Sequence, residues 1–366
     1  MEERFRQRRD TIRRRKDFPA DFSLSPGEEE FFRRLGSEEK ASLRSLKLAI
    51  TPHYFSLIGN EEDDPIRLQA IPRVEEFDTL PYEKEDPLED LRYSPVERLV
   101  HRYRDRVLIL LTGECLTYCR HCFRRHFSSH GSGAIQGGQL EAVLDYIRGR
   151  EDIHEVILSG GDPLSLEDER FFGILRRIQE AVPRPLIIRI ATRAPVVMPQ
   201  RMAPPFLDGL ADFPRVFLIT QFNHPRELSR ESGAVLDACA DRGIPVYNQA
   251  VLLKGVNDSV ETLSQLFQRL LEFRVKPYYL FQGDLASGTS HFRVPLDRGM
   301  ELYRQLRQRI SGLAMPTYAV DLPGGGGKVP LVESYLDTLV EGEGGEAQRA
   351  YRFTGPDGLN YYYPAE

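Results

Sequence analysis

The sequence predicts an α/β fold with a buried parallel sheet. Between about residues 106 and 310, short apolar runs of strand length alternate with amphipathic helical segments, and this pattern repeats about six times. Repeated strand–helix units imply parallel strands. Several of the apolar runs are continuous, as expected for strands that are covered on both faces. This pattern is compatible with a full or partial βα barrel and with an open doubly wound sheet.

The predicted elements follow one another in a regular order. The expected strands cover residues 107–111, 156–158, 186–191, 216–220, 246–253 and 277–281. The expected helices lie near residues 138–148, 166–182, 227–241, 260–273 and 296–310. Polar residues gather in the segments directly after these strands. In βα barrels the active site is built at this end of the strands.

The chain before and after this repeat has a different character. Phe31 and Leu35 lie at helical spacing, and so do Leu43, Leu46 and Ile50. The end of the chain combines an acidic, glycine-rich hinge with a tyrosine-rich segment. The predicted organisation therefore has three parts: a helical N-terminal region at residues 1–100, the βα barrel at residues 101–330 and a tail at residues 331–366.

Composition and charge exclude several classes of protein. The net charge of −6 over 366 residues does not favour a nucleic-acid partner. No apolar run approaches the roughly 18 residues that a membrane span needs. The basic N-terminus lacks the apolar core of a secretory signal, and its acidic residues argue against an organelle transit peptide. We therefore expect a cytoplasmic enzyme with no membrane partner.

Three of the four cysteines form a tight group. Cys115, Cys119 and Cys122 lie within eight residues, whereas Cys239 is alone. Such a group argues against a disulfide framework and for a metal or cluster site in a reducing compartment. Three thiolates can bind three irons of a 4Fe–4S cluster and leave the fourth iron open for a substrate or cofactor. Zinc sites more often use two separated Cys-X2-Cys pairs.

This cysteine spacing, directly after the first strand, resembles that of the radical SAM superfamily. The resemblance implies S-adenosylmethionine bound to the open iron. It also implies a partial (βα)6 barrel of the TIM type with a helical N-terminal extension. Ser159, Gly160, Gly161 and Asp162 resemble the superfamily's glycine-rich loop that holds the methionine amino group. Glycine lets the backbone approach a ligand closely, but a simple strand-to-helix turn is the alternative for these four residues alone.

A second signal is the segment from Asp321 to Lys328. Its four consecutive glycines, residues 324–327, disfavour the interior of a helix or strand. They predict a flexible loop that delivers Lys328. The segment is not a phosphate-binding P-loop, because no Ser or Thr follows the lysine. A lysine presented in this way can form a Schiff base with pyridoxal phosphate, and a solvated hinge is the alternative.

Together the two signals resemble the lysine 2,3-aminomutase family, over about residues 50–330. The matching stretches are residues 50–58, 101–106, 119–125, 223–225, 248–258 and 321–328. The resemblance implies an isomerase that uses the cluster, S-adenosylmethionine and pyridoxal 5′-phosphate. The implied reaction moves an amino group between the α- and β-carbons of an amino acid. It also implies an electron donor such as flavodoxin or ferredoxin.

The resemblance implies cofactor roles for individual residues. Lys328 would be the lysine that binds pyridoxal phosphate covalently. Further contacts with that cofactor are implied for Arg102, Tyr103 and Arg106, and an arginine fork suits phosphate oxygens. His121 and Gln249 resemble residues that lie near S-adenosylmethionine.

The resemblance also implies how the substrate is held. Arg124 would bind the substrate carboxylate, and Asp284 with Asp321 would bind its distal amino group. Two carboxylates in a shielded site favour a cation between them, because each otherwise raises the pKa of the other. An acidic substrate would predict a cation at one of these two positions. L-Lysine is therefore the expected substrate, and arginine stays open.

The chain departs from the longer members of the family in one respect. Ser259 stands where a zinc-binding cysteine would be expected, and the tail has no cysteine. We therefore expect no zinc site, which puts a zinc-supported tetramer in doubt but leaves a homo-oligomer open. Residues 122–127 also resemble shorter relatives that supply β-lysine for the modification of elongation factor P. An iron–sulfur or RNA-modifying radical SAM protein without pyridoxal phosphate is the alternative of another class.

Overall fold

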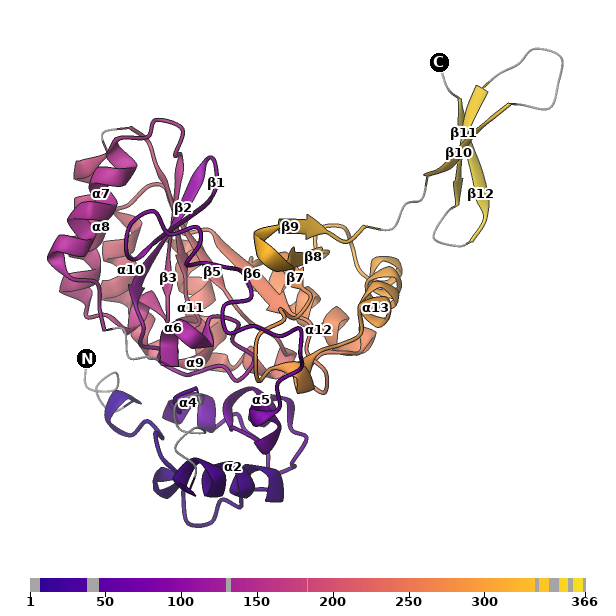
Figure 1. The fold of residues 1–366 in the computed structure, drawn as a ribbon. Coiled ribbons are helices and arrows are strands. Elements are labelled where there is room, and N and C mark those ends of the chain that lie inside the picture. Colours follow the sequence, from indigo (N-terminus) through magenta and orange to yellow (C-terminus); the bar gives the residue numbers. More distant parts are fainter. Residues whose placement is uncertain are drawn as a thin grey trace.

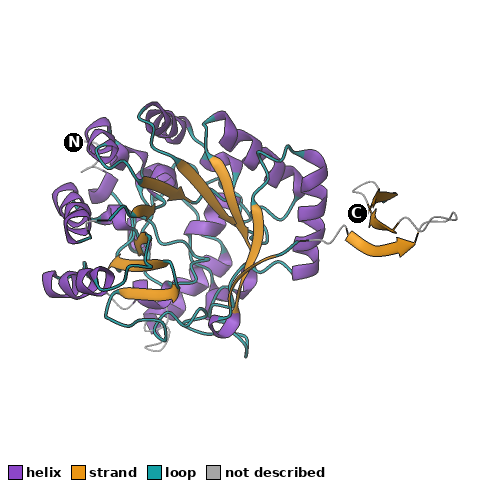
Figure 2. Ribbon diagram, turned by 90° about the horizontal axis from the view of Figure 1, so that it is seen from above, coloured by secondary structure: helices purple, strands orange, loops and turns teal. Residues whose placement is uncertain are grey.

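Nine strands form one curved sheet, in the order in which they occur along the chain (Figure 1, Figure 2). The computed structural model describes residues 7–37, 46–129, 133–182, 184–332, 336–341, 349–354 and 358–364. The strands are β1 (Leu99–Tyr103), β2 (Arg106–Thr112), β3 (Glu155–Gly160), β4 (Ile187–Ala191), β5 (Val216–Thr220), β6 (Val246–Val251), β7 (Lys276–Phe281), β8 (Thr317–Leu322) and β9 (Gly327–Pro330). Strands β2 to β8 run parallel, and β1 and β9 pair antiparallel at the two edges. Within the described ranges β1 and β9 do not pair, so the predicted partial barrel is confirmed.

Helices follow the parallel strands β2 to β7 along the chain. They are α7 (Gly137–Arg148), α8 (Asp168–Ala181), α9 (Ala194–Val197), α10 (Pro204–Ala211), α11 (Arg230–Asp241), α12 (Val260–Glu272) and α13 (Leu296–Arg309). Six strand–helix units thus precede β8, as predicted. The sequence did not predict β8, nor α9 and α10. Both helices are short and begin at or next to a proline, so neither shows a long apolar period.

The core lies between the sheet and these helices. Helix α12 shows the principle: Val260, Leu263, Leu266, Phe267 and Leu270 are buried and recur at the three- and four-residue spacing of one helix face. Burying one such side chain contributes roughly 1.5–3 kcal/mol. The helix begins at Ser259, whose hydroxyl accepts a hydrogen bond from the N–H of Thr262. The residue at the expected zinc position is therefore a helix cap.

An N-terminal layer packs beside the barrel and is drawn in indigo in Figure 1. It contains α2 (Pro26–Ser37), α4 (Pro52–Phe55) and α5 (Pro65–Ala70). The helix suggested by Leu46 and Ile50 is wrong: residues 46–49 are not helical, and Ile50 forms a β-bridge with Ile12. Leu43, which also belonged to that pattern, lies outside the described residues.

Short elements link these parts. The helix α6 (Arg125–Ser129) follows the cysteine segment. The 3-10 helices are η1 (Arg15–Asp17), η2 (Val74–Phe77), η3 (Pro163–Ser165), η4 (Pro199–Met202), η5 (Pro225–Glu227), η6 (Ser290–Phe292) and η7 (Pro323–Gly325).

The tail contains a second sheet. It is antiparallel and consists of β10 (Leu336–Glu341), β11 (Arg349–Thr354) and β12 (Asn360–Pro364). Figure 1 shows it in yellow, separate from the barrel. Most of the acidic hinge predicted at residues 341–346 lies outside the described residues, from residue 342 onward. Among the helices described here, none has the length and apolar character needed to cross a membrane.

Candidate active site

The three clustered cysteines lie on the segment that follows β2. Cys115, Cys119 and Cys122 are partly buried free thiols. Burial raises the pKa of Cys115, and the other two sulfurs raise it further. Burial and the neighbouring Cys119 likewise raise the pKa of Cys122, to about 11. Three thiolates at this place therefore need a positively charged partner, as a metal cluster would provide.

The N-terminal layer holds the cysteine segment in place. The N–H of Tyr118 donates to the carbonyl of Ala49 at 3.2 Å, and the N–H of Arg120 donates to the carbonyl of Gln69 at 2.9 Å. The Arg120 side chain is fully buried and donates to both oxygens of Glu76, at 2.7 and 2.6 Å. This layer is thus part of the site's architecture.

The end of β3 packs directly against the cysteine segment. Gly160 has a φ of +123°, and a Cβ there would stand 2.4 Å from the carbonyl oxygen of Thr112. A Cβ on Gly161 would stand 2.3 Å from the carbonyl oxygen of Glu114 and 3.0 Å from Cys115 Sγ. Only glycine leaves room for this contact. The two glycines therefore bring β3 against the cysteines, whatever ligand they also touch.

The polar neighbours of these glycines bind protein groups. Asp162 accepts hydrogen bonds from the N–H of Leu164 at 2.9 Å, the Thr192 hydroxyl at 2.8 Å and the N–H of Arg193 at 2.9 Å. Burial raises the pKa of Asp162. Ser159 Oγ accepts from Arg124 Nη1 at 3.3 Å. Asp162 thus fixes the start of the segment after β4. The sequence did not predict this role for Asp162.

His121 and Gln249 lie on different elements. His121 is buried beside the cysteines, and its Nε2 lies 3.0 Å from Gln221 Nε2 and 3.3 Å from Asn223 Nδ2. Burial lowers the pKa of His121 well below its usual value, so the ring is neutral. Its Nδ1 is buried and has no partner among the described residues. Gln249 lies on β6, opposite Tyr279 on β7.

Lys328 lies on a strand and not on a flexible loop. The glycines form the turn of a hairpin between β8 and β9, where Gly324, Gly325 and Gly327 have positive φ. In this hairpin Asp321 is the direct cross-strand partner of Lys328. The N–H of Lys328 donates to Tyr103 Oη at 2.9 Å. The predicted glycine loop is therefore the turn of a hairpin, and Lys328 lies on the strand that follows it, paired with β8.

The Lys328 side chain pairs with Asp321 and lies within electrostatic reach of Asp284. Its Nζ lies 3.6 Å from Asp321 Oδ2, and 4.8 and 4.2 Å from the ring centroids of Tyr279 and Phe281. Burial lowers the pKa of Lys328, although Asp321 and Asp284 oppose this effect. Burial, with the charge of Asp321, raises the pKa of Asp284 to about 7. The structure thus brings the three residues into one electrostatic cluster.

Two of the three predicted arginines, Arg124 and Arg102, lie at a carboxylate that the sequence did not single out. Arg124 Nε donates to Asp90 Oδ2 at 2.9 Å, and Arg102 Nη2 lies 3.7 Å from Asp90 Oδ1. Burial alone would raise the pKa of Asp90, but Arg124 and Arg102 outweigh it and lower that pKa. Arg106 stacks on Tyr103, 3.9 Å from the ring centroid, and donates to Asp105 at 2.7 Å. Asp90 comes from a polar loop, so its burial could not be foreseen.

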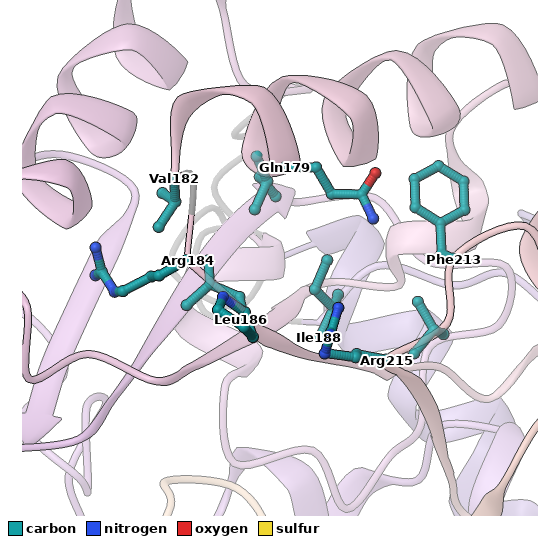
Figure 3. Close-up of a pocket in the computed structure, with 10 residues that line it drawn as sticks. Gln179, Val182, Arg184, Leu186, Ile188, Phe213 and Arg215 are labelled. Atoms are coloured by element: carbon teal, nitrogen blue, oxygen red, sulfur yellow. The ribbon is translucent and has the colours of Figure 1, made fainter.

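A separate cavity lies beside the amino ends of β4 and β5 (Figure 3). It has a volume of about 350 Å³ and is lined by residues at the end of α8 and at the amino ends of β4 and β5, among them Val182, Leu186, Ile188 and Val216. None of the predicted site residues lines it. The three cysteines, the glycines at the end of β3 and Asp284 instead lie at or just after the carboxyl ends of their strands, which is where βα barrels place their active sites.

Comparisons with known proteins agree with this site. Residues 105–193, which include the three cysteines, match the family model described as "4Fe-4S single cluster domain". Residues 303–342 match the one described as "Lysine-2,3-aminomutase". The L-lysine 2,3-aminomutase of Acetoanaerobium sticklandii is 44% identical over 314 residues, which are 86% of this chain and 74% of that protein. This chain belongs to the lysine 2,3-aminomutase family.

Two further relatives show the range of the family. The putative L-lysine 2,3-aminomutase of Aquifex aeolicus is 45% identical over 312 residues, 84% of each chain. The glutamate 2,3-aminomutase of Clostridioides difficile is 40% identical over 319 residues, 86% of this chain and 72% of that one. Membership confirms the predicted isomerase class, a 2,3-aminomutase, and the predicted iron–sulfur cluster.

Proposed function

We propose that this 2,3-aminomutase interconverts L-lysine and its 3-amino isomer with the help of a 4Fe–4S cluster, S-adenosylmethionine and pyridoxal phosphate. The observation that carries the proposal is the cluster of Asp284, Asp321 and Lys328 at the end of the barrel. A lysine that can hold an aldehyde cofactor stands there beside two carboxylates that can hold a cation.

The cysteines fit a cluster better than a single ion. Among the described residues, no three side chains of His, Cys, Asp or Glu converge on one metal position. In a cluster each thiolate binds its own iron, so the sulfurs need not converge. We assign Cys115, Cys119 and Cys122 as its ligands. The free thiols suit a reducing compartment such as the cytoplasm.

Residues near the cysteines fit the binding of S-adenosylmethionine. The buried Nδ1 of His121 has no partner in the described part of the chain, so it can donate to a ligand. The close approach of Gly161 to Cys115 leaves backbone groups of the β3 loop beside the cluster. We assign Ser159, Gly160, Gly161, Asp162, His121 and Gln249 to the surroundings of this cofactor.

Residues of β1, β2 and β9 fit pyridoxal phosphate. Arg102 Nε is buried without a partner in the described residues, and its planar fork suits a phosphate oxygen. Arg106 stacks on Tyr103, the residue that follows Arg102 in β1, and Tyr103 also fixes the backbone of Lys328. Burial favours the neutral amine of Lys328, which is the form that attacks a carbonyl carbon.

The two cofactors supply the demanding chemistry. When bound, S-adenosylmethionine provides a hydrogen-abstracting radical after one-electron reduction, and pyridoxal phosphate provides the π-system across which the nitrogen moves. The required electron suits a donor such as flavodoxin or ferredoxin. The protein binds and orients the substrate and keeps water out.

The charges of the site favour a cationic substrate. Asp284 and Asp321 can accept the distal ammonium of lysine, which relieves the repulsion between them. The same pair repels the distal carboxylate of an acidic substrate. Arg124 can bind the substrate carboxylate by exchanging its present partner, Asp90.

A substrate panel tests this proposal. The enzyme is reconstituted anaerobically with iron, sulfide, pyridoxal phosphate and S-adenosylmethionine, and then incubated with L-lysine, D-lysine, L-arginine or L-glutamate and a reductant. Only L-lysine should give its 3-amino isomer at a substantial rate. Preferred turnover of L-glutamate or L-arginine would contradict the substrate assignment. A protein that binds no iron or no pyridoxal phosphate would contradict the cofactor assignment.

A further inference from the structure

Arg193 reaches from the end of β4 to the cysteine segment. The residue follows Thr192, directly after the strand, and its side chain is buried. Its Nη1 donates to Cys119 Sγ at 2.9 Å. A permanently charged donor thus touches one of the three sulfurs assigned to the cluster.

The Nε and Nη2 groups of Arg193 also donate hydrogen bonds. Its Nη2 donates to Glu227 at 2.5 Å, to Gln69 Oε1 at 2.7 Å and to Tyr54 Oη at 3.0 Å. Its Nε donates to the carbonyl of Gln221 at 3.1 Å. Because these four partners fix the guanidinium plane, the direction of the bond to Cys119 is fixed as well.

Glu227, the carboxylate that pairs with Arg193, is also fixed by hydrogen bonds. Glu227 is fully buried and also accepts from Tyr54 Oη at 2.6 Å and from the N–H of Asn223 at 2.6 Å. A buried arginine–glutamate pair with this many hydrogen bonds keeps both charges in a medium of low dielectric constant. The positive end of this pair is the one that faces the cysteines.

We propose that Arg193 is a positioning residue that holds Cys119 as a cluster ligand and raises the reduction potential of the cluster. Reduction adds negative charge to the cluster and its sulfurs. A nearby cation and an N–H donor on a ligand sulfur stabilise the reduced form, and both are recognised means of tuning such potentials. The inference rests on the proposed function, which places the cluster at these cysteines.

A purely structural role for Arg193 makes a different prediction. The guanidinium also ties the N-terminal layer, through Tyr54 and Gln69, to the barrel. If that were its whole purpose, its replacement would change stability and leave the potential of a loaded cluster unchanged. The potential therefore separates the two roles.

The test compares two changes at Arg193 with a matched buried pair. Arg193→Lys keeps the charge and loses most of the donors. The double change of Arg193→Met with Glu227→Gln removes both charges, so no buried charge is left alone. The control is Arg67→Met with Glu28→Gln, because Arg67 and Glu28 form an ion pair that is equally buried and touches no cysteine.

Each variant is reconstituted anaerobically, its iron and sulfide are measured, and its midpoint potential is determined by redox titration followed by electron paramagnetic resonance. Both Arg193 variants should have a more negative potential than the wild type, with the larger shift in the double variant. The control should keep the wild-type potential. Loss of the cluster from both Arg193 variants, with a loaded control, would also support the holding role.

Two results would overturn the inference: an unchanged potential in loaded Arg193→Lys and in the loaded double variant, or the same shift in the control. If the double variant alone fails to load, Arg193→Lys decides by its potential and by its Fe–S(Cys) stretching bands in resonance Raman spectra. A wild-type protein that forms no cluster would instead refute the proposed function, so the two failures are distinguishable.

Discussion

Asp321 and Lys328 face each other across the antiparallel strands β8 and β9, with Lys328 Nζ 3.6 Å from Asp321 Oδ2. One hairpin therefore carries both the lysine assigned to the cofactor and a carboxylate assigned to the substrate. Tyr93 and Tyr103 hold this hairpin, through the carbonyl of Gly325 at 3.2 Å and the N–H of Lys328 at 2.9 Å. The distance between cofactor and substrate groups is thus set by local strand register.

The first prediction concerns pH. Because burial and Asp321 raise the pKa of Asp284 to about 7, Asp284 takes up a proton as the pH falls through that value. A protonated carboxyl no longer attracts an ammonium group, so the KM for lysine should rise as the pH falls through 7, by about 10- to 100-fold in total for the loss of one charged partner.

The variant Asp321→Asn serves as the matched test of this mechanism. Removing the neighbouring charge lowers the pKa of Asp284, so the rise in KM should begin at a lower pH. Losing one charged partner of the substrate should also lower kcat/KM at pH 8 by about 10- to 100-fold. Steady-state kinetics from pH 5.5 to pH 8.5 measures both effects. This range extends about one and a half pH units to either side of the pKa of Asp284. A flat KM profile in the wild type would contradict the assignment.

The second prediction concerns the glycine that packs against the cysteines. In Gly161→Ala the new Cβ would stand 2.3 Å from the carbonyl oxygen of Glu114, so the cysteine segment must move. The reconstituted variant should lose most of its iron, measured per polypeptide. Gly173→Ala, in α8, is the control, because a Cβ there meets no atom within 4 Å. It should load normally and gain about 0.5–1 kcal/mol of stability. Normal iron content in Gly161→Ala would refute the packing argument.

The third prediction concerns the buried carboxylate under the cysteine segment. Glu76 accepts from Arg120 at 2.7 and 2.6 Å and from Arg125 at 2.7 Å. Glu76→Gln leaves two buried guanidinium groups without a counter-charge and should cost about 3–5 kcal/mol in the free energy of unfolding. Glu30→Gln, which removes an exposed ion pair with Arg33, should leave the free energy of unfolding nearly unchanged, because solvent screens such a pair. Urea unfolding at neutral pH distinguishes the two.

The pH dependence of the stability of the wild type and of Glu76→Gln gives an independent check. Burial alone would raise the pKa of Glu76, but Arg120 and Arg125 outweigh it and lower that pKa. The stability that this carboxylate contributes is therefore present above its unfolded pKa and is lost as the pH falls through the folded one. The difference between wild type and Glu76→Gln should shrink on acidification. If the difference in the free energy of unfolding stayed constant with pH, the charge of Glu76 would not be what stabilises the fold.

Much of the fold could be predicted because the barrel repeats. The six predicted strands correspond to β2 to β7, since each is a short apolar run followed by a helical period. Strand β8 could not be found in this way. Its burial pattern is irregular, and it ends in Asp321 and Leu322, of which Leu322 is exposed. Its pairing with β7 and β9 defines it as a strand, and that information is tertiary.

The site was predicted where residue chemistry is unusual and missed where it is ordinary. Three clustered cysteines and a lysine after four glycines stand out in any sequence. Asp90 and Arg193 do not, because aspartate and arginine are common on loops and only the fold shows that both are buried. Residues whose role comes from long-range contacts need the structure.

The most direct test of the whole account is the product formed from L-lysine carrying deuterium at C3. The reconstituted holoenzyme should produce 3,6-diaminohexanoate with deuterium at C2, as detected by nuclear magnetic resonance and mass spectrometry. Lys328→Ala should keep its iron and form at least about 10³-fold less product. A holoenzyme loaded with iron and pyridoxal phosphate that returns the lysine unchanged, or a Lys328→Ala variant with wild-type turnover, would contradict it.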